Sequence, residues 1–384
     1  MEQRRFSGNS HWYHETQSSL TIQTAPLVPE AADIEDRFLL GLAPLCDGEL
    51  KNTLQQAQPA LQVSRYLYQV LFPAQLSTTR TQTLTLYDRL STALTVAQVT
   101  GIQRLCNHYA ARLNPLSGPD SSRESNRRLT QITEYARQLA SQPTLIDCAA
   151  LQRLDDVGLT LPDIITFSQI IGFVSYQARV VAGINALLAI PVRWIPGVVI
   201  PDDARPEYFE NTAPWQPQLT PVERRYASAS QLEALTFCQS QQGLNESAWL
   251  LAHDAETLYG WSVLRTTLEA PMATPESSLA AAVTARINGS PACFYRYTHE
   301  TLRTALKKSI AQAMTSANTD EQAVIQLAAQ LTRSPERLSA AHLQPLNEAG
   351  LSQQAIFGVI QSVALANWNN RLLQTLGSTC PANA

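Results

Sequence analysis

Apolar residues recur at helical spacing along most of the chain. In the segment QAIFGVIQSVALANW, Ile356, Val359 and Ile360 fall three and four positions apart, which places them on one face of a helix. Thr274 is followed by proline and glutamate, a combination typical of a helix N-terminus. No segment shows the sustained alternation of apolar and polar residues that half-buried strands require. The pattern therefore predicts an all-α fold.

Two long segments of the chain match each other. Residues 139–179 and 331–371 share a helix, a Gly-Leu turn and a second helix at a constant offset of 192 positions, so that Arg179 corresponds to Arg371. Upstream, TALTVAQVTGIQRLCNHY matches LAAAVTARINGSPACFYRY at an offset of 188 positions. We therefore predict that one helical domain occurs twice, as a tandem duplication.

The match divides the chain into five parts. They are a flexible N-terminal head (1–29), a first repeat (30–190), a connector (191–221), a second repeat (222–377) and a C-terminal tail (378–384). The connector contains seven prolines, which prevent a continuous helix.

The composition is that of an ordinary globular protein, with 45% apolar and 16% charged residues. At 384 residues the chain exceeds one ordinary hydrophobic core, so two domains are expected. The net charge is −4, and the Arg and Lys residues are scattered rather than gathered into a basic stripe. We therefore expect no nucleic-acid partner.

Several features predict a cytoplasmic location. The first 25 residues contain no apolar run of the kind found in secretory signals. The most apolar segment, SQIIGFVSYQARVVAGINALLAI, has Arg179 at its middle, which favours a buried helix over a membrane span. The cysteines are widely dispersed, which favours reduced thiols over a disulfide framework. They are Cys46, Cys106, Cys148, Cys238, Cys293 and Cys380.

The repeated unit resembles the carboxymuconolactone decarboxylase or AhpD-like alkylhydroperoxidase superfamily, in particular its tandem, peroxidase-related members. The resemblance rests on a helix that ends in a small residue and glycine, a Gly-Leu turn, and a helix that ends in aromatic-x-x-Arg, over about nine-tenths of the chain. It implies a reaction centre Asn-Gly-Cys-x-x-Cys-x-x-x-His with a glutamate upstream. In that centre a thiolate attacks a peroxide or disulfide, and the second thiol resolves the product.

This sequence departs from the family motif. In the second repeat, the positions of the two cysteines, the histidine and the glutamate hold Ser290, Cys293, Tyr297 and Ser278. In the first repeat they hold Ile102, Leu105, Tyr109 and Leu90. The first site is therefore expected to lack thiol chemistry, and the second keeps one cysteine.

Cys293 has two interpretations. With Ser290 as N-cap and Pro291 in the first helical position, the thiol lies in a first turn, where the helix dipole and Arg296 would lower its pKa. Arg296 and Tyr297 would share its helix face, and Tyr297 could donate a proton. Alternatively, Cys293 is a small buried residue kept for packing. Ser290 lacks an adjacent base, so we interpret it as a cap rather than a nucleophile.

Other polar residues are interpreted structurally. His108 lies near Cys106 but does not share its helix face, and an exposed or capped histidine is expected. His299 is expected on the helix of Cys293, facing away from it. Arg179 and Arg371 either line a cleft or bind backbone carbonyls, and we favour the second role.

Two hypotheses about function stay open. The first is a thiol oxidoreductase of the peroxidase-related, AhpD-like type with Cys293 as nucleophile, supported by Arg296, Tyr297 and Ser290. Its partners would be a peroxide or another small-molecule substrate and an external thiol reductant. The second is a non-catalytic scaffold that binds a small molecule or a protein. No glycine-rich phosphate loop or cluster of metal ligands occurs, so neither cofactor nor metal is expected. We expect a homo-oligomer and no membrane partner.

Overall fold

The computed structural model describes residues 34–191, 200–210, 214–239, 241, 245–269 and 274–378, and over these residues the fold is all-α, as predicted. The helices of the first half are α2 (Gly48–Gln56), α3 (Gln58–Leu71), α4 (Leu86–Thr100), α5 (Gln103–Leu113), α6 (Arg123–Ser141), α7 (Cys148–Asp155) and α8 (Leu161–Leu187). Those of the second half are α9 (Ala229–Cys238), α10 (Asn245–Leu251), α11 (Ala255–Glu269), α12 (Pro275–Asn288), α13 (Pro291–Phe294), α14 (Glu300–Lys308), α15 (Ile310–Ser316), α16 (Thr319–Arg333), α17 (Ala340–Glu348) and α18 (Gln353–Thr375).

Short elements complete the described chain. The 3-10 turns are η2 (Ala43–Leu45), η3 (Pro143–Leu145), η4 (Pro206–Phe209), η5 (Arg224–Tyr226), η6 (Ala252–Asp254) and η7 (Pro335–Arg337). The described part of the predicted connector contains η4 and β1 (Gln216–Pro217), which pairs antiparallel with β2 (Gly377–Ser378) near the end of the chain.

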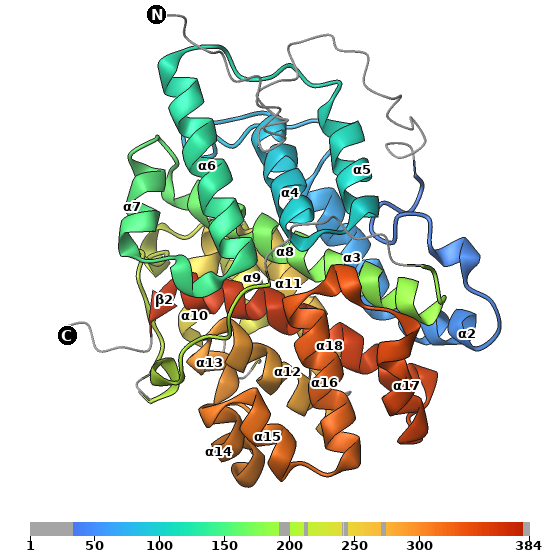
Figure 1. Ribbon diagram of the computed structural model, residues 1–384. Helices are drawn as coiled ribbons and strands as arrows, with labels where there is room; N and C mark the ends of the chain where they lie inside the picture. The colour runs from blue at the N-terminus through green and yellow to red at the C-terminus, as the bar shows by residue number, and fades with distance from the viewer. Residues whose placement is uncertain are drawn as a thin grey trace, which may run out of the picture.

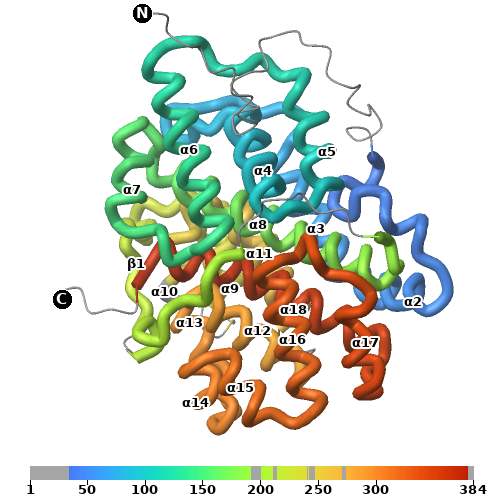
Figure 2. Tube along the Cα trace, viewed as in Figure 1, coloured from blue at the N-terminus to red at the C-terminus, as the bar shows by residue number. Residues whose placement is uncertain are grey.

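The two longest helices, α8 and α18, pack against each other at the centre of the molecule (Figure 1). Helices α4 to α7 lie on one side of this pair and α12 to α17 on the other, as the Cα trace also shows (Figure 2). By length and composition α8 could cross a membrane, but 89% of its most apolar window is buried inside the protein. Its apolar surface is therefore covered by the chain's own helices, as expected for a core helix.

Local sequence explains where the central helices begin and end. Thr274 caps α12 by accepting a hydrogen bond from the backbone N–H of Ser277, which confirms the N-terminus predicted there. Gly101 and Gly289 end α4 and α12 with φ of 70° and 74°, a left-handed conformation that glycine adopts without a steric penalty.

The order of elements in the two halves corresponds at the predicted offset. The turns η3 and η7 span residues 143–145 and 335–337, which differ by 192 positions, and α7 and α17 both begin at matching residues. This correspondence fits a tandem duplication, which stays a prediction about the origin of the chain.

Contacts between the halves are reciprocal. Arg179 of α8 donates to the carbonyl of Thr332 at 2.8 Å, and Arg371 of α18 donates to the carbonyl of Ala140 at 2.6 Å. Residues 140 and 332 are themselves 192 positions apart, so each arginine reaches the matching carbonyl of the other half. Both side chains are buried, and the carbonyl-binding role favoured from the sequence is confirmed.

Candidate functional site

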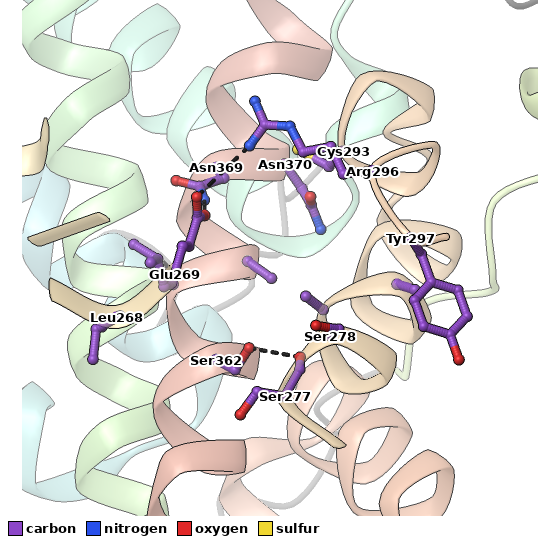
Figure 3. Close-up of a pocket in the computed structure, with 14 residues that line it drawn as sticks. Leu268, Glu269, Ser277, Ser278, Cys293, Arg296, Tyr297, Ser362, Asn369 and Asn370 are labelled. Atoms are coloured by element: carbon purple, nitrogen blue, oxygen red, sulfur yellow. Dashed lines mark hydrogen bonds and ion pairs between the residues drawn. The ribbon is translucent and has the colours of Figure 1, made fainter. Parts of the chain in front are cut away.

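A pocket of about 180 Å³ lies between the end of α11, the helices α12 and α18, and the α13 turn (Figure 3). Its wall is lined by Leu268, Glu269, Ser277, Ser278, Ala281, Ala282, Cys293, Arg296, Tyr297, Ser362, Leu365, Ala366, Asn369 and Asn370. Three of the predicted site residues, Cys293, Arg296 and Tyr297, therefore meet at one pocket. Ser278, at the position of the family's glutamate, lines it as well.

The helix that carries Cys293 is much shorter than predicted. It ends at Phe294 after four residues, so Arg296 and Tyr297 lie in the following turn and do not share a helix face with Cys293. The backbone N–H of Arg296 donates to the carbonyl of Cys293 at 3.2 Å, which closes this turn. The matching helix α5 continues over Ala110 and Ala111, which are strong helix formers, whereas the equivalent positions after Tyr297 hold Thr298 and His299.

Ser290 occupies the N-cap position of α13 but does not cap it. Its side chain makes no cap hydrogen bond, which corrects the role predicted from the sequence. The hydroxyl is buried and has no partner of ordinary hydrogen-bond geometry among the described residues. It lies close enough to Cys293 to favour the thiolate there. Ser290 thus belongs to the surroundings of the sulfur, behind the pocket wall.

The pKa of Cys293 is raised, not lowered. Burial among protein atoms is the largest influence and disfavours the thiolate, although the residue as a whole is half-buried and lines the pocket. Arg296 and Ser290 act in the opposite direction, while Glu269 adds to the increase in the pKa. The predicted lowering is therefore wrong, since a four-residue helix adds too little dipole to offset desolvation.

A network of charged and amide groups, not predicted from the sequence, forms one side of the pocket. The Glu269 carboxylate accepts from Arg265 at 2.6 and 3.0 Å and from the Asn369 amide at 2.9 Å. The Arg296 guanidinium lies 3.8 Å from the same carboxylate. Trp261 donates to the Asn369 oxygen at 3.0 Å, which fixes that amide in turn. Glu269 is therefore held in place, and it lies near Arg296, the one other charged residue among the described residues of the pocket wall.

Asn370 is the second residue of the site that was not predicted. It is fully buried on α18 and lines the pocket, into which its side chain points (Figure 3). Neither its amide nitrogen nor its amide oxygen has a hydrogen-bond partner among the residues that the structure describes. Buried polar groups nearly always have hydrogen-bond partners, so a buried amide whose nitrogen and oxygen both lack one needs an explanation. The available signal was the amide-rich sequence NWNN within an apolar helix.

The corresponding region of the first half is closed by large side chains. Leu90, Leu105 and Tyr109 are buried in the core. His108 is also fully buried and hydrogen-bonds to the Tyr68 hydroxyl at 2.7 Å, so the expectation of an exposed or capped histidine is wrong. The adjacent aromatic rings form a cluster around it.

Thiol chemistry is disfavoured at the corresponding site of the first half. Burial raises the pKa of Cys106 to about 12, so this thiol stays protonated near neutral pH. His299 was expected on the helix of Cys293, but this is wrong: it caps α14 by accepting from the Leu302 N–H. Among the residues that the structure describes, no group of three or more His, Cys, Asp or Glu side chains is placed to hold a metal ion.

Comparison of the sequence with protein-family models and with curated proteins found no match. The resemblance to the AhpD-like superfamily therefore stays a prediction, and function is argued from the pocket.

Proposed function

We propose that this protein binds a small molecule in the Cys293 pocket. Support comes from the contrast between the two halves, in which equivalent helices differ at the positions that line the pocket. The side chains are smaller at eight of these positions, among them Ser278 for Leu90, Ala282 for Leu94, Cys293 for Leu105 and Ala366 for Val174. The larger first-half residues are all buried in the core. Equivalent helices thus close the space in one half and leave it open in the other.

The proposal requires that molecules reach the sulfur through the pocket. Methyl methanethiosulfonate, a small uncharged thiol reagent, tests this in the full-length protein, with mass spectrometry to follow each cysteine. We expect Cys293 to react more slowly than the exposed Cys148 and much faster than the buried Cys106. Ala282→Leu, which restores the first-half side chain, should slow the reaction of Cys293 at least tenfold and leave Cys148 unchanged. A Cys293 as unreactive as Cys106 would refute the proposal.

A thiol oxidoreductase of the peroxidase-related, AhpD-like type is a second candidate. It is favoured by the position of the sulfur on the pocket wall, with Arg296 and Ser290 both acting to stabilise the thiolate. In this reaction the Cys293 thiolate attacks one oxygen of a hydroperoxide, an S–O bond forms, the O–O bond breaks, and the departing alkoxide takes up a proton. Sulfur is oxidised to a sulfenic acid, and the peroxide is reduced to an alcohol.

An external thiol must complete that cycle. Its attack on the sulfenic acid releases water and forms a mixed disulfide, and a second external thiol restores Cys293 while the two external thiols form a disulfide. The raised pKa of Cys293 disfavours this candidate, because only the thiolate attacks. Peroxide consumption in the presence of excess dithiothreitol decides the matter. Equal rates for the wild-type protein and Cys293→Ser leave binding as the function, and loss of consumption in the variant supports the enzyme.

A further inference from the structure

Among the described residues of the pocket wall, one buried polar side chain has no hydrogen-bond partner. Asn369 and Asn370 both line the pocket, but Asn369 uses its amide to bind Glu269 and Trp261. The Asn370 amide has no partner for either of its atoms, although its residue is fully buried. The amide nitrogen of Asn370 donates and the adjacent amide oxygen accepts, so a ligand group that pairs with both atoms must carry an acceptor next to a donor.

The rest of the wall argues against a charged ligand. Arg296 lies opposite Glu269, whose carboxylate is also held by Arg265 and Asn369, so the two charges of the wall offset each other. Apolar side chains from three helices, Leu268, Ala281 and Leu365, provide surface for an apolar body. The ligand features that fit are therefore a small apolar body and an uncharged polar head.

We propose that Asn370 orients the ligand of this pocket, and that the ligand is a small uncharged molecule whose planar head carries a hydrogen-bond donor next to a carbonyl acceptor, as a carboxamide does. This inference rests on the proposed binding function and adds the ligand class to it. Asn370 would accept from the ligand N–H through its oxygen and donate to the ligand carbonyl through its nitrogen. An acceptor-only ligand would leave the Asn370 oxygen unpaired and bind more weakly.

Three probes of nearly the same size test the ligand class. Benzamide carries donor and acceptor, acetophenone replaces the amino group by a methyl group, and benzoate is an anion. Each is added at the same concentration, and the protection of Cys293 from methyl methanethiosulfonate is measured, with Cys148 as the internal reference. We expect benzamide to slow the reaction of Cys293 at least fivefold more than acetophenone or benzoate.

Variants at Asn370 test the residue. In Asn370→Leu, and in Asn370→Ala, which copies the first-half residue Ala178, the advantage of benzamide over acetophenone should disappear. Equal protection by benzamide and acetophenone, no protection by either, stronger protection by benzoate, or an unchanged advantage of benzamide in both variants would overturn the inference. The binding function fails separately, if Ala282→Leu does not slow the reaction of Cys293 without any added probe.

Discussion

Replacing Asn370 by leucine should stabilise the protein. The variant keeps a side chain of similar length and removes two buried polar atoms that have no partner. An unsatisfied buried polar group costs about 1–3 kcal/mol, and removing such a group in favour of an apolar one recovers that free energy. Allowing for an imperfect fit of the leucine, we expect the free energy of unfolding to rise by about 2 kcal/mol.

The matched control lies one turn earlier on the same helix. Asn367 is also an asparagine and also fully buried, but its amide is satisfied. Its oxygen accepts from Asn288 at 3.1 Å and from Arg371 at 2.9 Å, and its nitrogen donates to the carbonyl of Val363 at 2.9 Å. Asn367→Leu leaves those partners without their hydrogen bonds and should lower the free energy of unfolding by about 2–4 kcal/mol.

Thermal unfolding measures both changes. With an unfolding entropy of roughly 2 cal/mol/K per residue, a gain of about 2 kcal/mol in this chain raises Tm by about 2–3 °C. Asn367→Leu should shift Tm in the opposite direction by a similar or larger amount. A lower Tm for Asn370→Leu would refute the reasoning, because it would mean that the Asn370 amide is already satisfied in the folded protein. The opposite signs exclude a general intolerance of α18 to leucine.

Three further outcomes follow from the charges around the sulfur and from the reciprocal arginines. Because burial raises the pKa of Cys293, its alkylation rate should rise with pH and reach its midpoint above the ordinary thiol value of about 8.5. Glu269→Gln removes a negative charge and should lower that midpoint, whereas Arg296→Met should raise it, so midpoints that move together would contradict the arrangement. Arg179→Met and Arg371→Met each leave a carbonyl of the other half without its donor, and each should lower the free energy of unfolding by about 1–3 kcal/mol. Because the two contacts are equivalent, the two losses, measured by thermal unfolding, should agree within about 1 kcal/mol.

Helical periodicity and capping chemistry predicted the fold well, because both depend on residues that are close in sequence. The N-cap at Thr274 and the glycine that ends α12 are examples. The predicted length of α13 was wrong, and the sequence difference that accompanies the early end is also local: Thr298 and His299 stand where α5 has Ala110 and Ala111.

The site was only partly predictable, because its groups come from helices far apart in sequence. The motif comparison indicated Cys293 and Tyr297, and helical spacing added Arg296; all three line the pocket, although they do not share a helix. Glu269 and Asn370 were missed, since nothing local indicates that the end of α11 and the C-terminal part of α18 meet beside the sulfur. Whether a buried amide has a partner also depends on neighbours that no local pattern specifies.

A pocket and an unpaired buried amide occur at the same place in the second half. A sealed dry cavity of about 180 Å³ would cost roughly 4 kcal/mol, an upper limit here because this pocket is reached by solvent. The unpaired Asn370 amide adds its own cost at the pocket wall, whereas the first half has the apolar residues Leu90, Leu94 and Ala178 at the equivalent positions. Destabilising features that coincide at one point in one half, next to a cysteine that solvent can reach, are what a ligand-binding site requires, because the bound molecule fills the space and pairs the amide.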